Sequence, residues 1–197
     1  MILLDEPFSN LDAALRVRVR SDLKRILRAA GTPPVIFVTH DQDEALSFAD
    51  KVAVMFDGQV VQIDTPQNLY AHPNSLRVAT FLGEANVLEG RLSNGLVSCE
   101  LGNLPYAQDS ETHAEAQTKI LIRPESLQLV KKDSELPTGE VMDREYYGHD
   151  QMILVQMPSG QILRCRCSPN TPVEKGDRVG LSIKTPVSLF QPTNDNR

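Results

Sequence analysis

The sequence opens with Met1-Ile2-Leu3-Leu4-Asp5-Glu6-Pro7, which predicts a short strand that ends in two carboxylates. A run of apolar residues that stops at polar residues is typical of a strand buried on both faces of a sheet. Asp5 and Glu6 would then lie at the carboxyl end of this strand, where open α/β sheets bind their ligands. The alternative is a strand that only stops at a polar turn before Pro7.

A second strand is predicted over residues 35–39, and it ends in His40 and Asp41. Residues 11–30 carry apolar side chains at helical spacing and predict a helix between the two strands, with Gly31 at its C-terminal end. The helix also carries many basic residues, which we interpret as a solvated face. Strand, helix and strand form a βαβ unit, in which the two carboxyl ends share one edge. Taken singly, His40 is also compatible with a hydrogen-bonded structural role.

These segments resemble the ATP-binding subunits of ABC importers of the sugar, polyamine, sulphate and ferric-iron type. Leu3-Leu4-Asp5-Glu6-Pro7 is similar to their Walker B segment, and Ser9-Asn10-Leu11-Asp12 is similar to their D-loop. Val38-Thr39-His40-Asp41 is similar to their switch-histidine loop. The order and spacing of the segments agree over about 50 residues, which is more specific than any one motif.

The resemblance implies a role for each of four residues in ATP hydrolysis. Asp5 would bind Mg²⁺, Glu6 would position or activate the hydrolytic water, and His40 would contact the γ-phosphate of ATP. Asp12 would face a second ATPase subunit across a dimer interface. The implied enzyme is an ABC-type ATPase with ATP and Mg²⁺ as cofactors. It would act with membrane-spanning permease subunits on the cytoplasmic face of the plasma membrane, and indirectly with a solute-binding protein.

Two glycine-rich elements of that family are absent from this sequence. The family has a P-loop with a lysine and a signature loop with adjacent glycines, whereas here no glycine is followed by lysine or by glycine. We therefore expect the C-terminal portion of such an ATPase, which alone would bind ATP poorly and be inactive. Its first strand and the apolar face of its first helix would lack neighbours, so we expect a homo-oligomer.

Local signals define the elements that follow the second strand. Asp41 and Glu44 have the spacing of a capping box. Asp57-Gly58 predicts a type I′ hairpin turn, and Thr65-Pro66 predicts the start of a helix. A further short helix is predicted over residues 75–82.

From Asn86 onward the helical periodicity gives way to short alternating strands, which predict a small barrel. The fold class expected for the chain is thus a partial α/β P-loop NTPase domain at residues 1–84, followed by an all-β OB-like barrel at residues 85–197. The predicted strands of the barrel are residues 87–92, 96–101, 120–122, 127–130, 140–143, 152–157, 161–167, 178–183 and 187–190.

The second region resembles the accessory TOBE (MOP-like) β domain of the same importers. Arg123-Pro124-Glu125 and Gly176-Asp177-Arg178-Val179 carry this resemblance. Tyr146-Tyr147-Gly148-His149-Asp150 is most similar to the ferric-iron branch, which makes iron the favoured solute. His149 and Asp150 are compatible with a metal site or with a turn histidine beside a capping aspartate. The alternative function is a non-enzymatic regulatory, ligand-binding or dimerisation module built on this barrel.

Charge and cysteine content limit the remaining function classes. Residues 1–84 carry 8 Lys+Arg against 11 Asp+Glu and the rest 12 against 15, so each part has a net charge of −3 and no nucleic-acid partner is expected. Cys165 and Cys167 would share one face of a strand, either as soft-metal ligands or as small buried apolar residues, and Cys99 lies apart from them. No apolar run approaches the ~20 residues of a membrane span, so membrane association is expected through a partner.

Overall fold

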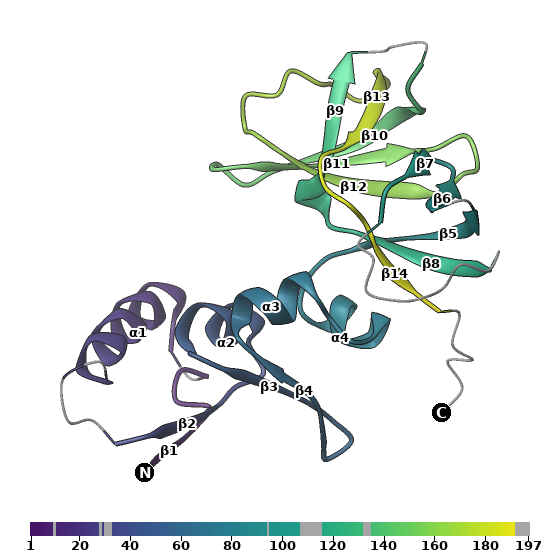
Figure 1. Cartoon of the computed structure of the whole chain (residues 1–197). Coiled ribbons are helices and arrows are strands. Elements are labelled where there is room, and N and C mark those ends of the chain that lie inside the picture. Colours follow the sequence, from purple (N-terminus) through teal and green to yellow (C-terminus); the bar gives the residue numbers. More distant parts are fainter. Residues whose placement is uncertain are drawn as a thin grey trace. The chain divides into compact units, whose positions relative to one another are not determined.

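A computed structural model describes residues 1–9, 11–27, 29, 33–93, 95–106, 116–131 and 135–191 of the chain. The chain separates into two compact units, Met1–Gly83 and Glu84–Arg197. Figure 1 shows that the first unit mixes helices and strands, whereas the second consists almost entirely of strands. Within the described residues, no helix is both long enough and apolar enough to cross a membrane.

The first unit begins with the predicted βαβ arrangement. Strands β1 (Ile2–Asp5) and β2 (Val35–Val38) pair in parallel, and helix α1 (Ala13–Leu27) lies between them in sequence. Helix α2 (Gln42–Phe48) follows β2 after a short turn. The predicted helix end at residues 28 and 30 and its cap at Gly31 lie outside the described residues, as does Asn10.

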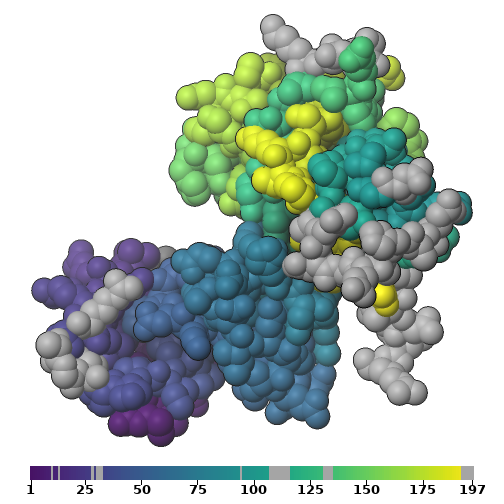
Figure 2. Space-filling view, viewed as in Figure 1, coloured from purple at the N-terminus to yellow at the C-terminus, as the bar shows by residue number. Residues whose placement is uncertain are grey.

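The prediction that β1 is buried on both faces is wrong. Leu3 and Ile36 are paired across β1 and β2, and they are 64% and 48% exposed. The opposite face is covered by an aromatic cluster, in which the ring centroid of Phe37 lies 5.5 Å from that of Phe8 and 5.2 Å from that of Phe48. Side chains alternate between the two faces of a strand, so a sheet covered on one side leaves every second residue exposed. The purple start of the chain accordingly lies at the surface in Figure 2.

The remainder of the first unit forms a small core of its own. Strands β3 (Val52–Phe56) and β4 (Gln59–Asp64) form the predicted hairpin, and both turn residues have positive φ, 52° at Asp57 and 77° at Gly58, as a type I′ turn requires. The predicted helix start is confirmed, since Thr65 caps α3 (Pro66–Ala71), and Ser75, the first residue of the second predicted helix, caps α4 (Leu76–Phe81). The buried core consists of Val52, Val54, Leu69, Val78 and Leu82.

The second unit confirms the all-β prediction, and the structure also shows how its strands are divided between sheets. Its strands form two five-stranded sheets, in the orders β12-β11-β10-β13-β9 and β14-β8-β5-β6-β7. Buried residues of both sheets, such as Ile120, Ile153 and Leu163, belong to one hydrophobic core. The bounds are β5 (Asn86–Ser93), β6 (Leu96–Cys99), β7 (Gly102–Leu104), β8 (Gln117–Ile122), β9 (Leu127–Lys131), β10 (Thr138–Tyr146), β11 (Gln151–Gln156), β12 (Ile162–Cys167), β13 (Arg178–Ile183) and β14 (Ser188–Phe190), with a 3₁₀ turn at Pro124–Ser126.

The strand that the sequence did not predict is β7, which has only three residues. Gly102-Asn103-Leu104 contains no apolar alternation, and it is a strand because it pairs with β6, with Val97 opposite Leu104. Pairing with a neighbour, rather than local propensity, therefore decides this element.

Candidate functional site

The structure brings together the polar residues that follow β1 and β2. The backbone N–H of Glu6 donates to the carbonyl of Val38 at 2.9 Å, which continues the parallel pairing by one residue. Nδ1 of His40 lies 2.9 Å from Oε1 of Glu6, although the two residues are 34 positions apart in the sequence. Figure 1 shows β1 and β2 side by side, with their carboxyl ends at the same edge.

Glu6 has an unusual backbone conformation, with φ of 43°. The left-handed region costs a residue other than glycine roughly 1–2 kcal/mol, so neighbouring contacts must hold it there. The carbonyl of Glu6 accepts two hydrogen bonds from Ser9, from the backbone N–H at 3.2 Å and from Oγ at 3.0 Å. The tight turn after β1 thus fixes the Glu6 carboxylate at the strand edge beside His40.

The electrostatic field of this edge acts on His40. The hydrogen bond that His40 donates to the Glu6 carboxylate, and then the negative charge of Glu6, raise the pKa of His40 above 6.5, and the carboxylates of Asp41 and Glu44 add to the effect. The pair with Glu6 is therefore fully formed below pH 6.5 and is lost as the pH rises through the raised pKa. The protonated ring has an N–H at each nitrogen, so Nε2 remains available to donate to an anionic acceptor.

A network of buried polar contacts lies beneath this pair. Glu44 is only 3% exposed, and its carboxylate accepts a hydrogen bond from Oγ1 of Thr39 at 2.7 Å. Nη2 of Arg20, on α1, lies 3.5 Å from the other oxygen of Glu44. Glu44 therefore links the end of β2, the first turn of α2 and the middle of α1.

Asp41 joins the same elements by a second route. Its Oδ1 accepts the N–H of Glu44 at 3.0 Å, which is the predicted N-cap of α2, and its Oδ2 lies 3.4 Å from Nη1 of Arg16. The other half of the predicted capping box is wrong. The N–H of Asp41 donates to Oγ1 of Thr39 at 3.0 Å instead of to the Glu44 side chain. A small pocket results, lined by Glu6, Ser9, Arg16, Thr39, His40, Asp41 and Glu44.

The other two predicted site residues lie outside this pocket lining. Asp5 is the exposed last residue of β1. Asp12 precedes α1, and its Oδ1 accepts the N–H of Leu15 at 3.0 Å, so it acts there as a helix cap. Of the four predicted residues, Glu6 and His40 are therefore in contact, whereas Asp5 and Asp12 are exposed to solvent and do not line the pocket.

Sequence reasoning missed Arg16, Arg20 and Thr39 as parts of the site. Arg16 and Arg20 are four positions apart, so they lie on one face of α1; Arg16 reaches Asp41, the N-cap of α2, and Arg20 reaches Glu44 in its first turn. The basic face of α1 is consequently not solvated throughout. The signal in the sequence was the four-residue spacing of Arg16 and Arg20, which matches two acidic residues at the N-terminus of the following helix, Asp41 and Glu44.

The donor atoms at this edge suit a magnesium ion. Mg²⁺ prefers oxygen ligands and is often held by one or two carboxylates, with waters and substrate phosphates as the remaining ligands. Asp5 and Glu6 supply such carboxylates at the end of β1. Among the described residues no group of three or more His, Cys, Asp or Glu is placed to bind a metal, so an ion here would depend on further ligands.

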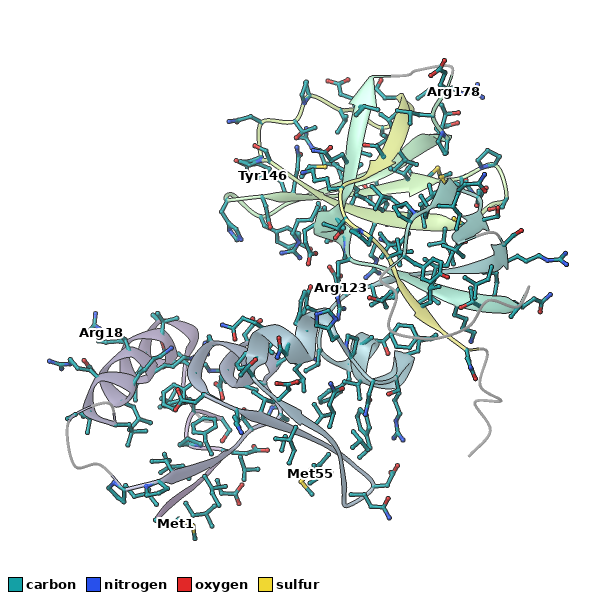
Figure 3. The ribbon with its side chains drawn as sticks, viewed as in Figure 1. Met1, Arg18, Met55, Arg123, Tyr146 and Arg178 are labelled. Atoms are coloured by element: carbon teal, nitrogen blue, oxygen red, sulfur yellow. The ribbon has the colours of Figure 1, made fainter. Side chains whose placement is uncertain are left out.

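The hairpin between β10 and β11 carries the segment with the ferric-iron resemblance. Figure 3 shows Tyr146 on this hairpin, and its side chain is 61% exposed. Nε2 of His149 lies 3.6 Å from Oδ1 of Asp150, while Oδ2 of Asp150 pairs with Nη1 of Arg166 at 3.1 Å. Asp150 is thus bound to a neighbouring strand, which favours the turn interpretation of His149.

Comparisons with known proteins identify relatives over most of the chain. A family model described as TOBE domain matches residues 120–186. The Fe(3+) ions import ATP-binding protein FbpC of Haemophilus influenzae (strain 86-028NP) is 43% identical over 162 residues, which are 80% of this chain and 45% of that protein. The Fe(3+) ions import ATP-binding protein FbpC 2 of Rhodococcus jostii (strain RHA1) is 37% identical over 93% of this chain and 53% of that protein.

A relative named for a different solute matches nearly as well. The spermidine/putrescine import ATP-binding protein PotA of Ruegeria pomeroyi is 37% identical over 95% of this chain and 53% of that protein. The chain spans about half the length of the curated relatives it matches. A solved structure of the cytoplasmic molybdate-binding protein ModG aligns with 54% of this chain and 96% of that chain, at 16% identity and a TM-score of 0.47.

Proposed function

Because this chain is homologous over most of its length to the ATP-binding proteins of ABC importers, we propose that it forms part of an ATP-binding subunit that couples ATP hydrolysis to solute import. Residues 1–84 would be the C-terminal part of the nucleotide-binding P-loop domain, and residues 85–197 the TOBE-type, OB-like regulatory domain. Ferric iron is the proposed solute, supported by the relatives that are named for Fe(3+) import.

The observation that carries the proposal is the 2.9 Å contact between Glu6 and His40. A carboxylate and an imidazole meet at the carboxyl end of two parallel strands, which is where α/β sheets bind their ligands. Glu6 is proposed to orient and deprotonate the attacking water. His40 would donate from Nε2 to the γ-phosphate, and the contact with Glu6 would keep its ring in position.

Asp5 is the residue proposed to hold Mg²⁺, because its carboxylate is exposed at the strand end beside Glu6. Bound Mg²⁺ would neutralise charge on the phosphates of ATP. The complete site also needs phosphate-binding backbone groups and a lysine of a P-loop, which this sequence does not contain. We therefore expect these residues to act only when that phosphate cradle is present.

The proposed partners follow from the same role. Membrane-spanning permease subunits would receive the energy of hydrolysis, on the cytoplasmic face of the plasma membrane. A second ATPase subunit would lie opposite Asp12, which is exposed at the start of α1. A solute-binding protein would contribute only indirectly.

A chimera with the phosphate-binding half of the Haemophilus influenzae relative tests the assignment. The wild-type chimera should hydrolyse ATP, and Glu6→Gln should lower turnover by roughly 10²–10⁴-fold while nucleotide binding persists, because the amide keeps the shape but loses the base. His40→Ala should also lower the turnover of ATP, because it removes the proposed contact with the γ-phosphate. Asp50→Asn is the matched control, since Asp50 is an exposed carboxylate outside the pocket lining.

Two results would contradict the proposal. If Glu6→Gln left turnover near that of the wild-type chimera, the assignment of the base would be wrong. If the 197-residue chain alone bound a fluorescent ATP analogue at micromolar concentration, the dependence on a separate phosphate cradle would be wrong. A wild-type chimera that neither binds nor hydrolyses ATP would favour the alternative, a non-enzymatic module carried by the second unit.

A further inference from the structure

Two cysteines of the second unit lie in contact on one strand. Cys165 and Cys167 both belong to β12, and their Sγ atoms are 3.5 Å apart. Cys165 is fully buried, and its single S–H lies within hydrogen-bond distance of two acceptors, the carbonyl oxygen of Leu127 at 3.2 Å and Sγ of Cys167. Cys167 lies at the end of the strand and is only partly buried, so a small solute can reach it. One thiol is thus accessible and its immediate neighbour is enclosed.

The surroundings favour the thiolate on one sulfur of the pair. The hydrogen bond from Cys165 and the positive charge of Lys184 lower the pKa of Cys167. The hydrogen bond with Cys167 and then burial raise the pKa of Cys165, which therefore stays protonated. Because the thiolate is the nucleophile of cysteine chemistry, Cys167 is the more reactive member.

A buried amide beside the pair provides an unused hydrogen-bond acceptor. Gln151 is 0% exposed and is the cross-strand partner of Cys167, so both side chains lie on the same face of the sheet. Nε2 of Gln151 donates to the carbonyls of Ser168 at 2.8 Å and Thr171 at 3.0 Å, which fixes the orientation of the amide. Oε1 finds no hydrogen-bond partner within the described residues, which is costly for a buried acceptor.

We propose that Cys165 and Cys167 form an oxidation site for hydroperoxides, in which Cys167 is the attacking thiol and Cys165 the resolving thiol. The Cys167 thiolate attacks the terminal peroxide oxygen and the O–O bond breaks, so that the sulfenic acid forms and the departing alkoxide or hydroxide takes a proton from water to give an alcohol or water. Oε1 of Gln151, on the same face of the sheet as Cys167, is the acceptor that we assign to the sulfenic O–H. Cys165 transfers its proton to the departing hydroxyl as its sulfur attacks the sulfenic sulfur, so that the disulfide and one water are formed together. The two electrons lost by the sulfurs reduce the peroxide.

The position of the pair on a strand makes this disulfide reversible. Two residues apart along a strand, the Cα atoms are about 6.4–6.8 Å apart, at the upper limit of the range that disulfides span. Among the described strands β12 is the outer strand of its sheet and pairs with β11, and Cys167 is its last residue, beyond the two hydrogen bonds that join Arg164 to Asn86. A disulfide at this limit is strained and is reduced readily by thiols. Figure 1 shows β12 alongside β11 in the second unit.

The third cysteine is a control within the same unit. Cys99 is also partly buried, but burial raises its pKa, and its sulfur accepts the N–H of Leu101 at 3.4 Å. The reduced full chain is treated with one equivalent of hydrogen peroxide at pH 7, and its free thiols are then alkylated and mapped by mass spectrometry. Cys167 should be oxidised about tenfold faster than Cys99, as expected for a larger thiolate fraction.

The product and two variants distinguish the proposal from general oxidation. In the wild-type chain a disulfide should form between Cys165 and Cys167, seen as a mass loss of two hydrogens, and dithiothreitol should restore both thiols. In Cys165→Ser, and likewise in Cys165→Ala, Cys167 should remain as a sulfenic acid that dimedone captures. In Cys167→Ser, the oxidation of Cys165 should fall to the rate of Cys99 or below. Far-UV circular dichroism verifies that each variant is folded.

Each contrary result overturns a defined part of the proposal. Equal rates for Cys167 and Cys99 would mean that the pair has no special reactivity. A wild-type product without the internal disulfide, whether a sulfinic acid or a bond between chains, would mean that Cys165 does not resolve the sulfenic acid. Rapid oxidation of Cys165 in Cys167→Ser would reverse the assigned roles.

Discussion

Replacing Glu44 should loosen the end of β2 and the start of α2 more than any exposed change on the same helix. The carboxylate is 3% exposed, accepts the 2.7 Å hydrogen bond of Thr39 and lies 3.5 Å from Arg20. A hydrogen bond to a charged group contributes about 1.5–3 kcal/mol. The contact with Arg20, whose side chain is 21% exposed, adds up to ~1 kcal/mol. Glu44→Ala should therefore lower the local opening free energy by about 2–4 kcal/mol.

Hydrogen–deuterium exchange measures this change in the first unit alone. Each 1.4 kcal/mol corresponds to tenfold, so amides of β2 and the first turn of α2 should exchange roughly 30- to 1,000-fold faster in Glu44→Ala. Glu44→Gln keeps an acceptor for Thr39 and loses only the charge, so its effect should stay below about tenfold. Amides of the second unit serve as the internal reference and should not change.

Asp43 is the matched control, because it is the exposed neighbour of Glu44 in the first turn of α2. Asp43→Ala removes a carboxylate that favours the helix N-terminus by about 0.3–1 kcal/mol, so exchange should rise by less than about fivefold. If Glu44→Ala and Asp43→Ala were indistinguishable, the buried network would not hold these elements together, and the account of the site would be refuted.

Three further predictions concern packing, protonation and assembly. Gly139→Ala would place a Cβ 2.8 Å from the backbone carbonyl of Gln156, which cannot move without disrupting the sheet, so urea unfolding of the second unit should lose about 1–3 kcal/mol. In Gly90→Ala the three atoms nearest to the new Cβ belong to the side chains of Ile120 and Val97, so the substitution should cost less; equal costs would contradict this. The pKa of His40, followed by NMR, should lie above 6.5 and should fall towards it in Glu6→Gln, whereas an unchanged value would mean that the pair does not form in solution. The exposed apolar face of β1 and β2 should make the chain a dimer or higher oligomer by light scattering, while residues 84–197 alone should be monomeric; a monomeric full chain would contradict this.

The sequence alone determined the elements that depend on contacts between near neighbours. The turn at Asp57-Gly58 requires positive φ, and the N-cap at Thr65 bonds to an N–H group three residues ahead. The strands of the second unit, apart from β7, followed from alternation of apolar residues. These signals act over a few residues, so they can be recognised without knowing what packs against them.

The tertiary structure decided burial and every contact between distant residues. The sequence suggested Glu6 and His40 separately, but their 2.9 Å contact depends on the pairing of two strands 33 residues apart. The exposed face of β1 depends on which elements cover the sheet, which an apolar run cannot reveal. Glu44 was expected to cap its own helix and instead bonds to Thr39, because burial beside α1 offers the carboxylate better partners than its own backbone. The role of a buried polar side chain is therefore determined by the groups that it contacts in the folded protein, and the periodicity of the sequence does not reveal them.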